Sequence, residues 1–214
     1  MKRFLFAAAL LIGVSVILTG DPQAYMLNGP KWNRTPISYY INSANLDLPG
    51  AAVEAAVRAG ADAWFQQSTA NFAFSYAGPS GVTTNTLDNV NVVMFRNASS
   101  GSAIATTYYW SSSSGLLDAD IVFWDGAFQF YSGTTGCSGG FYIEDIAAHE
   151  FGHALGMGHS ASTAATMYPS VSSCNQSNRL LDADDLAGVL ALYGARSGGA
   201  LPTPPKSLRI TTTP

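Results

Sequence analysis

The chain has 214 residues, carries a formal net charge of −4, and contains only 11% charged residues. Because no basic run is present beyond Lys2-Arg3, the composition excludes the positive face that nucleic-acid-binding proteins need. The length suffices for one domain with a hydrophobic core.

The N-terminal segment has the form of a secretory signal peptide. Lys2-Arg3 is followed by a largely apolar run over residues 4–18, which is short for a membrane span. We therefore expect residues 1–24 to be a signal peptide, with its cleavage point open. The protein is then expected to be secreted, without stable membrane insertion. An uncleaved N-terminal membrane anchor is the alternative.

The next part of the chain predicts several strands and one long helix. Residues 37–41 predict a strand, and residues 49–67 predict an amphipathic helix because Val53, Val57 and Trp64 recur at helical spacing. Apolar or alternating runs predict four more strands, over residues 72–76, 90–95, 104–110 and 120–124.

Two helices and a tail complete the chain. Residues 141–155 and 182–193 predict helices, the second with Asp182 as its N-cap and Asp185 three residues later. Residues 196–214 are rich in Gly, Pro and Thr, which is typical of a tail or linker without a core.

All three histidines of the chain lie in one stretch of the form H-E-x-x-H-x-x-G-x-x-H. His149 and His153 are one helical turn apart, so both rings lie on the same face of the predicted helix and can hold one side of a zinc ion. Gly156 tolerates the positive φ of a sharp turn, which would bring His159 to the same metal. Three imidazoles leave the fourth zinc position to water, as in a catalytic site.

Two other interpretations of this stretch are less favoured. A chance match would have to supply Glu150, Gly156 and a third histidine at the right spacing in a chain with no other histidine. A structural zinc would need a fourth ligand, and no Cys or further His lies nearby in the sequence.

The extended motif resembles that of the metzincin metalloproteases. These proteins carry a methionine-containing turn beneath the metal, and Met167 follows His159 by eight residues. Ser160 and the run Met167-Tyr168-Pro169 resemble the matrixin (matrix metalloprotease-like) branch in particular. The resemblance extends to three further segments, namely Trp32 with the strand at 37–41, the helix that ends near Trp64-Phe65, and residues 184–194.

This resemblance implies a fold and an activity. The fold would be α+β, with a twisted, mostly parallel sheet and an antiparallel edge strand, packed on the active-site helix and a first long helix, and with a C-terminal helix after the methionine turn. Residues 25–195 would form the catalytic domain of a zinc-dependent endopeptidase, with Glu150 as the general base for a zinc-activated water. The alternative is a catalytically inactive binding or adhesion module of the same fold, against which Glu150 argues.

The resemblance also implies roles for residues around the metal. Met167 would form an apolar floor under the zinc, and Asp185 would hold the methionine turn by hydrogen bonds. Tyr168 and Pro169 would form the wall of the pocket for the substrate residue after the cleaved bond.

Substrate binding leaves two choices open. The protein or peptide substrate would lie along an exposed sheet edge, formed by residues 104–108 or 120–124. Asp145 precedes His149 by four residues and would either line the floor of the pocket or, as we prefer, face solvent at the start of the helix.

The remaining expectations concern a disulfide, metals and assembly. Cys137 and Cys174 are the only cysteines, and in an exported protein they predict a disulfide rather than two buried thiols. The resemblance implies one catalytic zinc only, because the second, structural zinc that matrixins usually carry is bound by three other histidines and this chain has no further histidine. Calcium is a further candidate cofactor, with Asp118, Asp120 and Asp125 as its candidate ligands. The alternative is that these carboxylates are merely solvated, which is more common for acidic residues beside a turn. We expect a monomer. Matrixins usually carry an inhibitory prosegment whose cysteine blocks the zinc, and because no cysteine precedes Trp32 we do not expect inhibition of this form.

Overall fold

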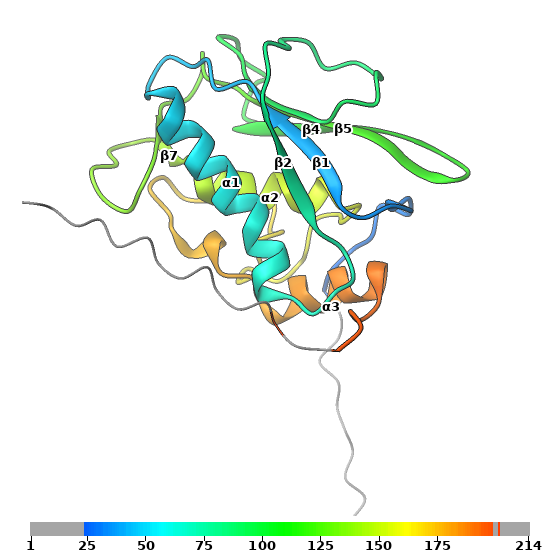
Figure 1. The fold of residues 1–214 in the computed structure, drawn as a ribbon. Helices are drawn as coiled ribbons and strands as arrows, with labels where there is room; N and C mark the ends of the chain where they lie inside the picture. The colour runs from blue at the N-terminus through cyan, green and yellow to red at the C-terminus, as the bar shows by residue number, and fades with distance from the viewer. Residues whose placement is uncertain (1–23, 199–200, 202–214) are drawn as a thin grey trace, which may run out of the picture.

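A five-stranded sheet and three α-helices form most of the computed structural model, which describes residues 24–198 and 201 (Figure 1). The strands of this sheet are β1 (Ile37–Ile41), β2 (Phe74–Pro79), β3 (Val92–Phe95), β4 (Ala105–Ser112) and β5 (Gly115–Phe123). The helices are α1 (Gly50–Gln67), α2 (Ile143–Ala154) and α3 (Ala183–Tyr193), with a short 3-10 helix at Ser177–Arg179. The expected signal peptide, apart from Ala24, falls outside the described residues, as does most of the expected tail.

The sheet is parallel except at one edge. Its strand order is β2-β1-β3-β5-β4; the first four strands run parallel, and β4 runs antiparallel to β5. This arrangement confirms the predicted fold class. It also decides between the two candidate edges, because β5 lies between β3 and β4 whereas β4 has a neighbour on one side only.

The two faces of the sheet bury different side chains, as the period of two along a strand requires. On one face, Ile121 and Phe123 of β5 pack with the helices in the main core. On the other face, Val122 packs with Trp124 in a smaller cluster, against which Val82 and Val90 of the loop before β3 also lie. The helices therefore pack on the face of the sheet that carries Ile121 and Phe123.

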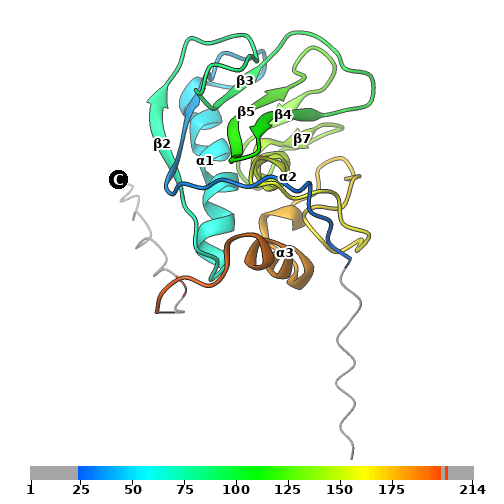
Figure 2. The ribbon, with the colours of Figure 1, turned by 90° about the vertical axis from the view of Figure 1, so that its right-hand side faces the viewer.

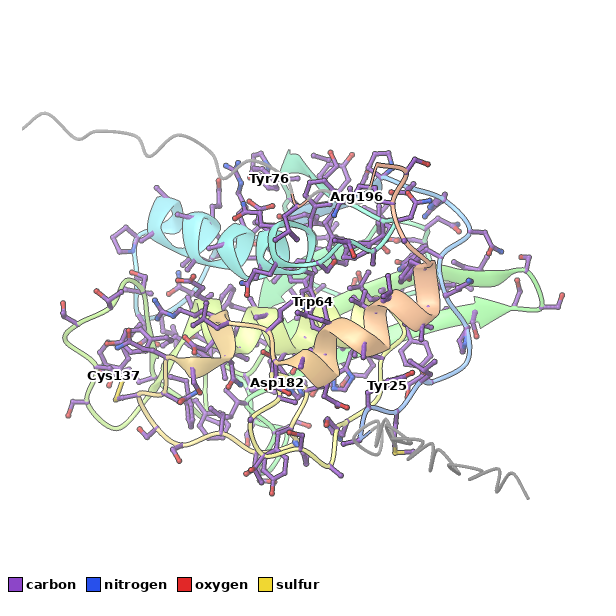
Figure 3. The ribbon with its side chains drawn as sticks, turned by 90° about the horizontal axis from the view of Figure 1, so that it is seen from below. Tyr25, Trp64, Tyr76, Cys137, Asp182 and Arg196 are labelled. Atoms are coloured by element: carbon purple, nitrogen blue, oxygen red, sulfur yellow. A yellow bond between two sulfur atoms is a disulfide. The ribbon has the colours of Figure 1, made fainter. Side chains whose placement is uncertain are left out.

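Helices α1 and α2 lie beneath the sheet, and α3 lies below α2 (Figures 1 and 2). Trp64 joins the first two helices, because its fully buried indole donates a hydrogen bond from Nε1 to the carbonyl oxygen of Ala148 at 2.7 Å (Figure 3). Gly60 allows this approach, since a Cβ atom there would lie 2.6 Å from the Cβ of Ala147. The longest helix thus fixes the position of α2. No helix of the described residues is both long and apolar enough to cross a membrane.

The predicted elements are present, with shifts at some ends. The strand predicted at 72–76 is β2 at residues 74–79, because Phe72 is buried in the core without belonging to the ladder. The helix predicted from residue 141 begins at Ile143, because Phe141 and Tyr142 form β7 and pair with β6 (Phe130–Tyr131). Apolar patterns report burial, and the strand and helix ends depend on backbone partners that the pattern does not contain.

Candidate active site

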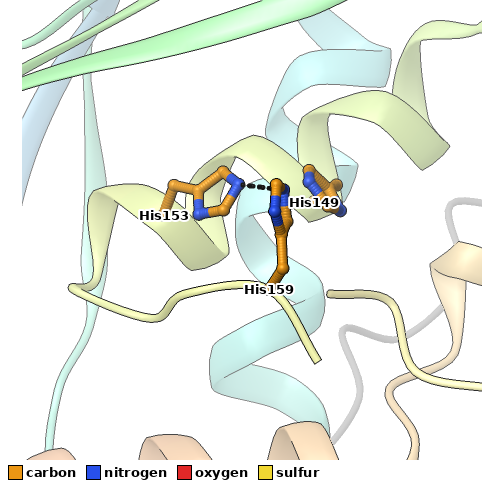
Figure 4. Close-up of side chains that lie close together, drawn as sticks. All are labelled: His149, His153 and His159. Carbon is orange, nitrogen blue, oxygen red and sulfur yellow. Dashed lines mark hydrogen bonds between the residues drawn. The ribbon is translucent and has the colours of Figure 1, made fainter. Parts of the chain in front are cut away.

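The three histidine rings converge at one point on the helical side of the sheet (Figure 4). His149 and His153 project from α2, and His159 comes from the segment after it. One ligand atom from each ring lies within 4.8 Å of the others, and Nε2 of His153 is 3.2 Å from Nε2 of His159. Two nitrogens that bind one tetrahedral zinc at about 2.05 Å are about 3.3 Å apart, so this spacing fits that ion.

The other nitrogen of each helical histidine ring is held by a backbone carbonyl. Nδ1 of His149 lies 2.7 Å from the carbonyl oxygen of Thr166, and Nδ1 of His153 lies 2.9 Å from that of Met157. A carbonyl oxygen only accepts, so each Nδ1 carries the proton and each Nε2 presents a lone pair to the centre. This donor set fits a zinc ion, because outer hydrogen bonds of this kind orient metal-binding imidazoles.

The protein also keeps these rings neutral. Burial lowers the pKa of His149 and of His153 to about 4, and it lowers the pKa of His159 as well. Since only a neutral imidazole binds a metal, the side chains are ready to do so at neutral pH without first losing a proton.

Two glycines let the chain approach the site closely. Gly156 follows the helix with a φ of 101°, and a Cβ atom there would overlap the carbonyl oxygen of Pro30. The predicted turn at Gly156 is confirmed. Gly152 faces Met167 and Trp64, and a Cβ atom at this position would overlap the sulfur of Met167. The fully buried Met167 therefore packs directly against α2 at Gly152, a position between His149 and His153.

Asp185 holds the methionine turn and also caps α3. Its two carboxylate oxygens accept hydrogen bonds from the backbone N–H groups of Thr166, at 2.7 Å, and Met167, at 3.0 Å. The same side chain accepts from the backbone N–H of Asp182 in a capping box. Because the carbonyl of Thr166 orients His149, Asp185 is connected to the histidine cluster through one peptide unit.

Glu150 lies between the histidines and the edge strand. Its side chain is only 5% exposed, and Oε2 accepts a hydrogen bond from the hydroxyl of Thr107 on β4 at 2.6 Å. Burial raises the pKa of the Glu150 carboxyl, while His153 and the Thr107 hydrogen bond oppose that rise.

A cleft of about 750 Å³ opens over the histidines. Its lining includes the three histidines and Glu150, together with Tyr168 and Pro169, which is the place expected for the pocket wall. Residues 103–107, at the start of β4, border it on the opposite side. The cleft is therefore lined by residues of the edge strand and of the methionine turn.

Asp145 occupies neither of the positions considered for it. Its side chain is 1% exposed, so the preferred solvent-facing position is wrong, and it is absent from the residues that line the cleft. Its Oδ2 accepts from Nε of Arg179 at 2.7 Å, and its Oδ1 accepts from the backbone N–H of Asn178 at 3.2 Å. A distant arginine, which the local sequence could not reveal, compensates the burial of this charge.

The disulfide between Cys137 and Cys174 is present, with the two Cα atoms 5.6 Å apart (Figure 3). It joins the segment before β7 to the loop after the methionine turn. Phe141 and Val171, which lie near the two ends of this link in sequence, both line the cleft. The disulfide and the Asp145–Arg179 pair therefore tie this loop to the start of α2.

The three aspartates considered for calcium are buried rather than solvated. Both oxygens of Asp120 and one oxygen each of Asp118 and Asp125 accept backbone N–H hydrogen bonds. Among the oxygens of these three aspartates, only Oδ1 of Asp118 and Oδ1 of Asp125 are buried without a partner. In the part of the chain described here, the only group of three or more potential metal ligands is the histidine cluster. A single calcium ion held by these three aspartates is therefore not supported.

Sequence reasoning missed Thr107, Thr166 and Arg179. A threonine in a strand is common and carries no motif. Thr166 contacts His149 through its backbone carbonyl, which any residue would supply. The pairing of Arg179 with Asp145 spans 34 positions in the sequence. The one available signal was weak: Arg179 is the single arginine between Cys174 and α3, and it could have been considered as a partner for a buried carboxylate.

The comparisons with known proteins agree with this geometry. The family model described as matrixin matches residues 31–194. The chain is 28% identical over 189 residues to neutrophil collagenase of Homo sapiens, covering 87% of this chain and 39% of that protein. It is 31% identical over 177 residues to karilysin of Tannerella forsythia, covering 83% and 36%, and 29% identical over 175 residues to matrilysin of Homo sapiens, covering 79% and 61%. The chain thus spans less than two thirds of each of these relatives.

Proposed function

The chain belongs to the matrixin family, and we propose that it is a secreted zinc-dependent endopeptidase. The observation that carries this proposal is the convergence of three histidine nitrogens beside a buried glutamate in an open cleft. The names of the similar collagenase and matrilysin agree with a protease. Both of these proteins are longer than the segment that this chain matches.

We assign one zinc ion to His149, His153 and His159. The hydrogen bonds that fix Nδ1 of the first two rings support this assignment, because they leave Nε2 free for the metal. Zinc, when bound, supplies the Lewis acidity that lowers the pKa of water and polarises a peptide carbonyl.

The chain's own residues supply the proton transfer and the orientation. Glu150 lines the cleft and has a carboxylate that can accept a proton from the attacking water and return it to the departing amine. Met167 packs under α2 and supports the histidines without binding the metal. Asp185 keeps the methionine turn in place.

The substrate is proposed to bind as an extended strand along β4. This strand has one free edge, and its first residues border the cleft. Unpaired backbone groups of an edge strand can bind a peptide by adding a strand to the sheet. Tyr168 and Pro169 would then form the wall of the pocket after the cleaved bond.

Further parts of the proposal concern processing and assembly. We propose that residues 1–24 are a signal peptide, residues 25–195 the catalytic domain and residues 196–214 a tail or linker, and that the protein is monomeric. The disulfide supports export, because such bonds persist in oxidising compartments. For calcium, the unpartnered oxygens of Asp118 and Asp125 are the remaining candidate ligands, in separate places.

The decisive experiment compares Glu150→Gln with Glu54→Gln, which changes a carboxylate outside the cleft. Wild type should hydrolyse a quenched fluorescent peptide, and a chelator should abolish the reaction. Glu150→Gln should retain about one zinc per chain and lose about 10²- to 10⁴-fold in rate, the usual contribution of a general base. Glu54→Gln should behave as wild type.

Peptide binding without hydrolysis by zinc-loaded wild type would instead favour the inactive binding or adhesion module. A second zinc at full stoichiometry would contradict the assignment of a single metal site.

A further inference from the structure

The hydroxyl of Thr107 is bonded to the residue that the proposed function uses as its base. Its Oγ1 lies 2.6 Å from Oε2 of Glu150 and 3.0 Å from the backbone oxygen of the same residue. A hydroxyl has a single proton, and a carboxylate oxygen at 2.6 Å is the stronger acceptor. Thr107 therefore donates to Oε2.

The two partners of this bond come from elements that are held by separate interactions. Thr107 is paired with Ile121 of β5 in the antiparallel ladder, and its β-branched side chain has restricted χ1 freedom. Glu150 lies on α2, which is fixed against α1 by the Trp64 indole. The Thr107 hydroxyl therefore has a fixed position, and its hydrogen bond can orient the Glu150 side chain, which has three rotatable torsions.

The bond makes the two carboxylate oxygens of Glu150 different. Oε2 is occupied by Thr107, whereas Oε1 receives no hydrogen bond from the described residues. Glu150 itself lines the cleft. A proton taken up by this carboxylate would therefore be carried on Oε1, from which it can be returned to a group in the cleft.

We propose that Thr107 is a positioning residue that orients Glu150 so that Oε1 exchanges the proton with the reacting groups. This inference rests on the proposed peptide hydrolysis. It also connects substrate binding with proton transfer, because Thr107 belongs to the strand along which the peptide would lie. Thr107 acts through Glu150 and does not itself react.

The test uses Thr107→Val, which has nearly the same shape but no hydroxyl, and Thr107→Ser, which keeps the hydroxyl. Thr107→Ala is a second variant without a hydroxyl, in case the valine variant does not fold. The matched control is Thr84→Val, which removes a hydroxyl from an exposed position in the loop before β3. All variants are studied as zinc-loaded proteins, and their zinc content and thermal unfolding are recorded.

Thr107→Val should lower kcat about tenfold to a hundredfold, in line with the loss of one hydrogen bond to a charged group. KM should stay within about twofold, because the lost contact is not made to the substrate. Thr107→Ser should restore kcat to within about threefold of wild type, and Thr84→Val should leave it unchanged.

Two readouts do not depend on turnover. A phosphinic peptide, whose tetrahedral group resembles the transition state, should bind more weakly to Thr107→Val by isothermal titration calorimetry, while a product peptide should bind equally. A crystal structure of Thr107→Val should show the Glu150 carboxylate rotated from its wild-type position.

Thr107→Val or Thr107→Ala with wild-type kcat would overturn the inference, as would an unmoved Glu150 carboxylate in the crystal. Failure of Thr107→Ser to restore kcat would overturn it too, because the effect would then come from packing. If wild type itself hydrolyses no peptide, the proposed function fails, and the crystal structure still tests the orienting role of Thr107.

Discussion

Replacing Arg179 by Met should destabilise the fold strongly, although Arg179 lies outside every sequence motif. The side chain of Asp145 is 1% exposed and that of Arg179 is 14% exposed, and their charged atoms are 2.7 Å apart. Removing one partner of a buried pair leaves the other charge without compensation, which costs about 3 to 5 kcal/mol. Arg179 also contacts Glu144 at 3.0 Å and the carbonyl oxygen of Gly133, so we expect the upper part of this range.

The loss of stability in Arg179→Met should depend on pH in a defined direction. Burial raises the pKa of the Asp145 carboxyl above its usual value of 3.8, and Arg179 offsets part of this rise. In the variant the folded-state pKa rises further, so the folded protein favours the protonated carboxyl. Such a group stabilises the fold below its unfolded pKa and loses that contribution as pH rises through the folded pKa. The deficit relative to wild type should therefore be smallest near pH 4 and grow toward pH 7.

The measurement is urea unfolding followed by tryptophan fluorescence between pH 4 and 8, with a chelator present for every protein. Trp64 is fully buried and reports the packing between α1 and α2. A cycle with Asp145→Asn isolates the energy of the pair, and Arg34→Met serves as the control at an exposed arginine. A difference from wild type below about 0.5 kcal/mol, or one that does not change with pH, would refute this reasoning.

Two further predictions concern the supports of the site. The double variant Cys137→Ser/Cys174→Ser should lose about 4 kcal/mol of stability in the chain-entropy treatment of a loop with a sequence separation of 37; urea unfolding checks this, and equal stability of the reduced wild type and oxidised wild type would contradict it. Asp185→Ala should cost about 1–3 kcal/mol for each N–H left unpaired at Thr166 and Met167, and should weaken zinc binding about 10- to 100-fold through His149. Competition with a zinc-binding dye measures the affinity, and Asp182→Ala, which removes the helix cap but not the support of the turn, should leave it unchanged.

Much of the site could be predicted because its parts are close in sequence. The spacing of His149 and His153 follows from the helical repeat, and the turn at Gly156 follows from the freedom of a residue without Cβ. The residues that Asp185 contacts, at the methionine turn and at the cap of α3, lie within nineteen residues of it along the chain. The single pair of cysteines left one intramolecular partner for each.

The edge strand could only be narrowed to two candidates. Residues 104–110 and 120–124 both show strand patterns, and they pair with each other in the structure. Which of them is exposed depends on whether β3 joins one or the other. That choice is made by the whole parallel sheet, since a strand order is a property of all its members.

From the sequence by itself came the three candidate metal ligands, the helix that bears two of them, the glycine turn and the disulfide, because local spacing and residue chemistry indicate each of them. The fold class came from the resemblance of the motifs to those of the matrixins. Only the tertiary structure decided the surroundings of the charged groups. The local sequence predicts a solvent-facing position for Asp145, but in the fold Asp145 is buried against Arg179, which is 34 positions away in the chain. Glu150 is hydrogen-bonded to Thr107, which is 43 positions away. Whether a carboxylate can be buried depends on the partners that the fold brings to it, and those partners are not its neighbours in the chain.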